Sequence, residues 1–147
     1  MSTRQRNLPR NERGFSLVEV LIAVTIIVLM GGVVAYNVFP ELFRSQRDRA
    51  RVDIENISTA IKMHLARESR LPNDSEFPQV LLEGSKNHDE PYIDPTKAKD
   101  GQLLDPWGNA YVYKKLSGTN FELLSYGMDG APGGEKDDAD ISNKSDN

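Results

Sequence analysis

The chain has no cysteine among its 147 residues, which excludes several chemistries at once. Disulfide scaffolds, thiol catalysis and cysteine-ligated zinc or iron–sulfur sites all need that residue. Positive charge is scarce as well: the formal net charge is −4, whereas a general nucleic-acid binder needs a basic surface that releases counterions from phosphate. Hydrolase motifs are also missing, since the sequence has no Gly-x-Ser-x-Gly, no His-Glu-x-x-His and no histidine near its acidic stretch 129–140. The sequence therefore argues against an enzyme and against nucleic acid as a partner.

Apolar residues are concentrated in one block near the N-terminus. Between Leu17 and Phe39 only Glu19, Thr25 and Asn37 are clearly polar. As a helix this block is roughly 35 Å long, enough to cross a hydrocarbon layer of about 30 Å. The apolar region of a secretory signal peptide is only about 7 to 15 residues long. We therefore predict a membrane-spanning helix over residues 15–39.

The charges on either side of this block predict its orientation. The first 14 residues carry four arginines and one acid, while residues 41–55 balance four arginines against four acids. The positive-inside rule places the basic leader in the cytoplasm. The C-terminal domain is therefore expected outside the cytoplasm.

Glu19 is unusual because it lies inside the apolar block. A carboxylate costs about 2.5 to 3.5 kcal/mol at the middle of a bilayer, and less near the interface. Two interpretations are open: the side chain reaches the headgroups, or a partner offsets the charge. Gly31-Gly32 also allow two interpretations, as filler or as a site of close helix packing or local melting.

The residues around Glu19 carry a family resemblance. Arg13-Gly14-Phe15-Ser16-Leu17-Val18-Glu19 resembles the class III signal of type IV pilins and pseudopilins, with serine where threonine is commoner. The resemblance implies that residues 1–14 are a leader, that a prepilin peptidase cuts between Gly14 and Phe15, and that Phe15 is then methylated. The new α-amino group of a neighbouring subunit is largely cationic, so it is a natural partner for the Glu19 carboxylate during assembly.

The chain after the apolar block predicts a small α+β domain. Pro40 should kink the helix, yet an apolar stripe resumes and a helix is predicted as far as Ser69, where Leu71-Pro72-Asn73-Asp74 follows. A short helix is expected over 76–82, no element is assigned over 83–100, and segments 110–114 and 121–125 predict an antiparallel hairpin packed on the helix. Trp107 is expected to fill the join between the hairpin and the helix, and a surface aromatic for ligand binding is the competing interpretation. The stripe consists of Ala50, Ile54, Ile57, Ile61 and Leu65.

Three further segments are similar to the major pseudopilins of type II secretion systems. They are Leu71-Pro72, Asp105-Pro106-Trp107-Gly108-Asn109 and Tyr126-Gly127-Met128-Asp129-Gly130. With the N-terminal signal, the resemblance covers nearly all of the chain. It implies the type IV pilin-like fold: a long N-terminal transmembrane and filament helix packed on a small antiparallel sheet, with a C-terminal calcium-binding loop.

The stretch 129–140 interleaves five carboxylates with Gly130, Gly133 and Gly134. Oxygen ligands of this kind suit Ca²⁺, although the spacing is not that of an EF-hand; a solvated acidic tail is the alternative from composition. The resemblance favours calcium as the cofactor, and Lys136 departs from the small residue usual in the family. Without cysteine, calcium could take the place of the disulfide that many adhesive pilins use. The implied metal residues are Asp129, Asp137, Asp138 and Asp140.

The sequence thus predicts a structural protein of four parts: leader 1–14, transmembrane and filament-core helix 15–39, periplasmic domain 40–141 and flexible polar tail 142–147. We expect a single-pass inner-membrane protein that polymerises into a helical pseudopilus and drives folded proteins across the outer membrane. Expected partners are copies of itself, minor pseudopilins, the inner-membrane assembly platform, prepilin peptidase and, before assembly, membrane lipid. A type IV pilin for adhesion, motility or DNA uptake is the alternative, and a membrane-anchored hydrolase is the least favoured hypothesis.

Overall fold

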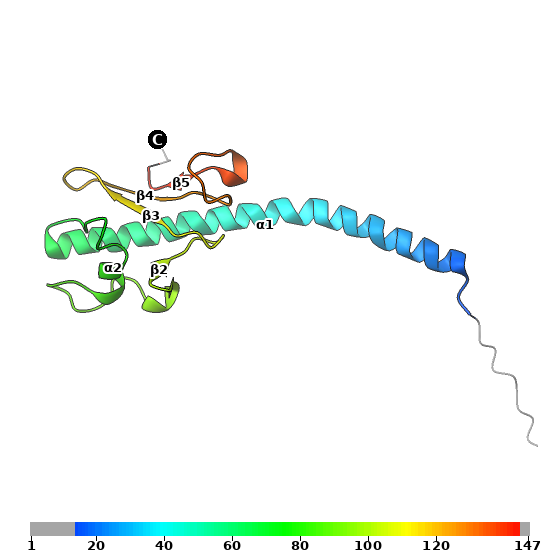
Figure 1. Ribbon diagram of the computed structural model, residues 1–147, viewed down its shortest axis with the longest axis horizontal. Coiled ribbons are helices and arrows are strands. Elements are labelled where there is room, and N and C mark those ends of the chain that lie inside the picture. The colour runs from blue at the N-terminus through cyan, green and yellow to red at the C-terminus, as the bar shows by residue number, and fades with distance from the viewer. Residues whose placement is uncertain (1–13, 145–147) are drawn as a thin grey trace, which may run out of the picture. The chain divides into compact units, whose positions relative to one another are not determined.

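The computed structural model describes residues 14–144, without the side chain of Asp137. It is an α+β protein, as predicted, and its order of elements is shown in Figure 1. The chain divides between Phe39 and Pro40 into two compact units. The elements are α1 (Leu17–Glu68), α2 (Gln79–Glu83), the 3-10 turn η1 (Pro95–Lys97), β1 (Ala98–Lys99), β2 (Gln102–Leu103), β3 (Val112–Lys115), β4 (Phe121–Ser125), the 3-10 turn η2 (Lys136–Asp138) and β5 (Ile141–Ser142).

Helix α1 ends one residue before the predicted boundary, and it continues through Pro40. Its last turn is followed by Ser69 in a left-handed conformation, with φ of 56°. This conformation commonly stops a helix because the next amide turns away from the helix axis. Leu71 and Pro72 then enter the core.

The core of the second unit forms where the C-terminal half of α1 meets the β-strands. The predicted stripe is buried from Ala50 to Ile61, and Leu65 packs partly buried against it. Burial of this kind stabilises by about 25 cal/mol per Å² of apolar surface. The strands and loops contribute the remaining core residues: Leu71, Leu81, Leu82, Leu103, Tyr111, Tyr113, Phe121, Leu123 and Ile141.

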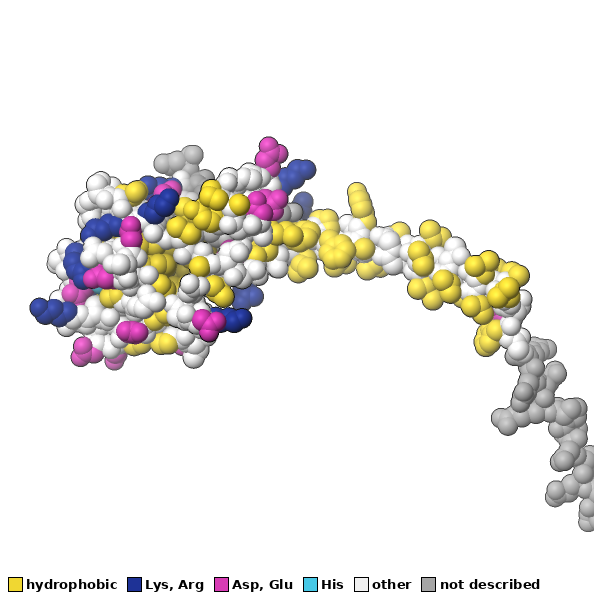
Figure 2. Space-filling model, viewed as in Figure 1, with side chains coloured by type: hydrophobic (Ala, Val, Ile, Leu, Met, Phe, Trp, Pro, Cys, Tyr) yellow, Lys and Arg dark blue, Asp and Glu magenta, His cyan; other side chains and the backbone are white. Residues whose placement is uncertain are grey.

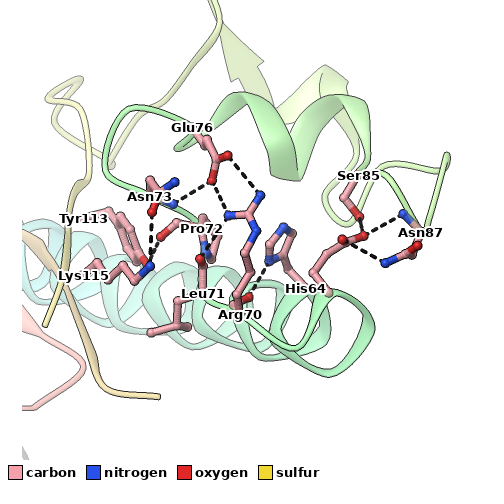
Figure 3. Close-up of polar contacts among 11 residues, drawn as sticks. His64, Arg70, Leu71, Pro72, Asn73, Glu76, Ser85, Asn87, Tyr113 and Lys115 are labelled. Atoms are coloured by element: carbon pink, nitrogen blue, oxygen red, sulfur yellow. Dashed lines mark hydrogen bonds and ion pairs between the residues drawn. The ribbon is translucent and has the colours of Figure 1, made fainter. Parts of the chain in front are cut away.

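Polar contacts hold the segment after α1 in place (Figure 3). Arg70 donates to both carboxylate oxygens of Glu76, at 2.7 and 3.0 Å, and the backbone amide of Asn73 donates to the same carboxylate at 2.8 Å. These contacts lower the pKa of Glu76 to about 2. They hold Glu76 in a turn, and Pro78, which has no amide hydrogen, is the residue directly before α2. Helix α2 therefore begins later than the predicted segment 76–82.

The predicted hairpin is confirmed. Strands β3 and β4 are antiparallel with Tyr113 opposite Leu123, and Tyr111 and Tyr113 are buried while Val112 between them is half-buried. The sheet order is β3-β4-β5, with a separate two-stranded pair β1-β2. Strand β5 extends the sheet to Ser142, one residue beyond the end that the sequence suggests for the domain. The unassigned stretch 83–100 holds η1 and β1.

Candidate functional site

The first functional feature is the apolar half of α1. Of the 22 large hydrophobic side chains that are exposed among the described residues, 17 lie between Phe15 and Phe39. Figure 2 shows hydrophobic side chains in yellow along the visible face of this part of the helix, with white atoms between them. By length and hydropathy, α1 is able to cross a membrane, and none of its most apolar window is buried. This surface needs lipid or other protein around it.

The polar side chains in this half of α1 differ in how they are satisfied. Thr25 donates to the carbonyl of Leu21, and Asn37 to that of Val33, both at 2.8 Å. Such bonds to the preceding turn hide a polar group inside its own helix. Glu19 is exposed and has no hydrogen-bond or ion-pair partner within residues 14–144. A carboxylate has no donor to offer and cannot bond to a helix carbonyl, so the backbone of its own helix cannot satisfy Glu19 as it does Thr25 and Asn37.

The residues of the predicted cleavage site lie just before the helix. Phe15 is 82% exposed, a side chain on Gly14 would meet nothing within 4 Å, and α1 begins at Leu17. The bond between Gly14 and Phe15 thus precedes the helix, in a segment without regular secondary structure. The rest of the predicted leader, residues 1–13, lies outside the described residues.

The second feature is the acidic loop, which we define as residues 129–140. Two of its residues are tied to each other: the amide of Gly133 donates to both carboxylate oxygens of Asp140 at 3.1 Å, and the amide of Asp140 donates to the carbonyl of Gly133 at 3.2 Å. Gly134 has a φ of +82°, and a side chain there would overlap the carbonyl oxygen of Asp138. Glycine is therefore required for the loop to close on itself.

A buried polar network fixes the start of this loop. The carboxylate of Asp105 accepts from the amides of Trp107 and Asn109, at 3.1 and 2.8 Å, and from Ser125 Oγ at 2.6 Å. Asn109 in turn donates to the carbonyl of Gly127 at 3.0 Å. Gly130 lies against the Asn109 side chain too closely for a Cβ. The 105–109 turn and the 126–130 segment, which the sequence offers as separate motifs, are thus one structure.

The structure places the predicted metal residues in one loop but does not assemble them around a point. Asp129 accepts from the amide of Ala131 at 3.0 Å, Asp138 is half-buried and Asp140 is exposed. Among the side chains that are described, no three acidic or histidine residues lie close enough to share a cation. The donor chemistry still fits calcium, because Ca²⁺ takes backbone carbonyls and waters alongside carboxylates. The ligand set stays a prediction.

Sequence reasoning missed Arg47, which reaches the acidic loop from α1. Its Nη1 donates to the carbonyl of Ala139 at 2.9 Å across 92 residues of sequence. No local pattern marks such a pair. The only sequence signal is an arginine on the helix and an excess of carboxylates far along the chain.

Comparisons with known proteins agree with these features. A family model described as type II secretion system (T2SS), protein G matches residues 37–144, and the prokaryotic N-terminal methylation motif matches residues 9–35. The type II secretion system core protein G of Pseudomonas aeruginosa is 34% identical over 145 residues, covering 91% of this chain and 96% of that protein. The core protein G of Vibrio cholerae is 28% identical, with 91% and 92% covered.

A solved structure supports the fold. The crystal structure of the major pseudopilin from the type 2 secretion system of enterohaemorrhagic Escherichia coli matches with a TM-score of 0.52 and 21% identity. The match covers 73% of this chain and 93% of that one. The long helix, the small sheets and the methylation motif define a pilin-like protein.

Within that class, the chain belongs to the type II secretion system protein G family. This confirms the resemblance to the major pseudopilins, and the alternative of an adhesive type IV pilin is not favoured. The family is that of the structural pseudopilins, and the apolar helix of this chain fits a membrane-anchored subunit.

Proposed function

We propose that this chain is the repeating subunit of a pseudopilus and performs no chemistry itself. The observation that carries the proposal is the exposed apolar half of α1, together with Glu19. A helix of this kind is stable in a membrane before assembly, and against the same helix of other copies after it. Growth of such a polymer from the inner membrane would push folded proteins toward an outer-membrane channel. Minor pseudopilins and an inner-membrane assembly platform are the further partners of this proposal.

The proposed topology follows from charge and composition. The arginine-rich leader stays in the cytoplasm, residues 15–39 cross the inner membrane and the second unit lies in the periplasm. A prepilin peptidase removes residues 1–14 on the cytoplasmic side and methylates Phe15. Support comes from the match to the methylation motif and from the position of Gly14 and Phe15 just before the helix, outside regular secondary structure.

Glu19 gives this polymer its register. Cleavage creates an α-amino group at Phe15, and a new subunit presents it to the Glu19 carboxylate of a subunit already in place. The pair removes a charge that is costly in an apolar setting. Subunits at other axial offsets would leave Glu19 unpaired, so the charge selects one arrangement.

Replacing Glu19 with alanine tests this proposal. We expect Glu19→Ala to leave the second unit folded and the protein in the membrane, while crosslinked multimers and secretion fall sharply. Glu41→Ala is the matched control. Glu41 is also an exposed glutamate on α1, with 80% of its side chain exposed, but unlike Glu19 it has an arginine nearby, Arg44 at 4.0 Å. Intact mass of the extracted protein checks that both variants begin at methylated Phe15.

Normal assembly and secretion by Glu19→Ala would contradict the register role. An N-terminus at Met1, or a cut within the apolar block, would contradict the processing step and with it the proposed free amine.

We also propose that the acidic loop holds Ca²⁺, with Asp129, Asp137, Asp138 and Asp140 supplying its carboxylate ligands. The support is the concentration of oxygen donors in a loop closed by glycines and anchored by the Asp105 network. When bound, the ion would offset repulsion among these carboxylates. The chain's own contribution is to bring the ends of the loop together, so that less ordering is needed on binding.

A further inference from the structure

The contact between Arg47 and the acidic loop joins two parts of the second unit that are distant in sequence. Arg47 is half-buried on α1 and donates to the carbonyl of Ala139 at 2.9 Å. Ala139 directly follows η2 and precedes Asp140. The guanidinium therefore meets the chain in its most acidic stretch.

The charges explain why an arginine belongs there. Residues 129–140 contain five acids and one lysine, and like charges held close together favour an open loop. An arginine stays protonated at all ordinary pH values, and its planar fork donates in fixed directions. Hydrogen bonds from a charged donor are roughly twice as strong as neutral ones.

Other contacts hold the loop near its C-terminal end. The amide of Asp140 donates to the carbonyl of Gly133, and Ile141, directly after the loop, is buried in β5 and shares the core with Ala50 and Ile54 of α1. Arg47 adds a charged attachment to α1 inside the loop itself, at Ala139.

We propose that Arg47 is a built-in cation of the acidic loop, which neutralises part of its charge and keeps it docked on α1 in the absence of a metal. Calcium then binds a loop that is already in place. The calcium part of this statement rests on the function proposed above, whereas the docking part does not. Because the ion and the guanidinium offset the same repulsion, each should matter more when the other is absent.

Tryptic cleavage after Lys136 measures opening of the loop directly, since Lys136 is exposed within it. The full chain in detergent is digested in chelator and in millimolar Ca²⁺, and mass spectrometry follows the fragment that begins at Asp137. Cleavage at Lys114 and Lys115 in β3 gives the opening of the sheet for comparison. Arg47→Gln is compared with Arg44→Gln, whose arginine is 77% exposed and lies 4.0 Å from Glu41.

In chelator we expect Arg47→Gln to speed cleavage after Lys136 by about tenfold, the factor that corresponds to about 1.4 kcal/mol of opening free energy. Cleavage in β3 should change little, and Arg44→Gln should match the wild type. Calcium should reduce the difference between Arg47→Gln and wild type. Arg47→Lys keeps the charge without the fork, so its rate should lie between the two.

Equal rates for Arg47→Gln and Arg44→Gln in chelator would overturn the proposal. Equal acceleration after Lys136 and in β3 would also overturn it, because Arg47 would then support the whole unit rather than the loop. If Arg47→Gln speeds loop cleavage but calcium alters no rate, the docking role stands and the calcium site fails.

Discussion

At the residue scale, the buried side chain of His64 makes the stability of the second unit depend on pH. It is fully buried, its Nδ1 lies 3.2 Å from the carbonyl of Arg70, and its Nε2 has no partner. Since a carbonyl only accepts, Nδ1 carries the proton and Nε2 is the basic atom. Burial lowers the pKa of His64 below 6.5, while the carbonyl of Arg70 and the nearby Glu68 and Glu76 act in the opposite direction.

We therefore expect the melting midpoint of the second unit to be constant above about pH 7 and to fall as the pH drops below the unfolded histidine pKa of about 6.5. In this range the imidazole of the unfolded chain binds a proton more readily than the buried imidazole of His64 in the folded chain. His64→Gln should flatten the profile between pH 7 and 5. The hydrogen bonds from Arg70 to Glu76 and from Ser85 to Glu68 lower the pKa values of the two carboxyl groups, so the stability that these contacts contribute is lost only below about pH 4.5. An unchanged slope in His64→Gln would contradict this assignment.

Residue roles that depend on local pattern could be predicted from the sequence, while those that depend on distant pairing could not. Glu19 is conspicuous because its neighbours are apolar. The role of Asp105 is not, since its partner Ser125 lies on β4, 20 residues further along the chain, and only the fold shows that the carboxylate is buried. Arg47 is hidden for the same reason.

At the scale of elements, the helix stripe and the β3–β4 hairpin follow from periodicity and turn residues, which act over a few positions. Strand β5 has two residues, too short for any alternation, and exists because β4 offers an edge. The start of α2 depends on the Arg70–Glu76 ion pair, a contact that the helix propensities of residues 76–82 do not reveal.

The acidic loop gives the prediction at this scale. If it binds Ca²⁺, the melting midpoint should rise with calcium, by about 2.7 kcal/mol of stability at a hundredfold excess over Kd. Magnesium should do much less, because it demands tight octahedral geometry and keeps its waters. Asp140→Asn should remove most of the gain, and Asp89→Asn, an exposed acid outside the loop, should not. Thermal melts followed by Trp107 fluorescence check this. No rise in the wild type at millimolar calcium would leave the loop as a solvated acidic segment, with Lys136 as the first residue to substitute.

At the scale of the whole molecule, two kinds of surface are kept in separate parts of the chain. Every residue of the core cluster lies between Ala50 and Ile141. Residues 14–39, the described part of the first unit, contribute nothing to that core and carry most of the exposed apolar side chains. The composition of the sequence predicts this division, because the apolar block is contiguous. It does not predict how β3, β4 and β5 complete the core of residues 40–144.

A fragment of residues 40–147 should therefore be soluble without detergent, monomeric, and folded with nearly the midpoint of the full chain in detergent. It retains the whole core and only a few exposed large hydrophobic side chains, which are Leu42, Val52, Met63, Leu116 and Met128. Such scattered residues are normal on a soluble surface. Sedimentation measures its mass, and Trp107 fluorescence compares its melting with that of the full chain. A fragment that aggregates, or that melts more than about 8 °C lower, a loss of about 1 to 2 kcal/mol for a domain of this size, would show that the apolar half of α1 supports the fold of the second unit as well as its assembly.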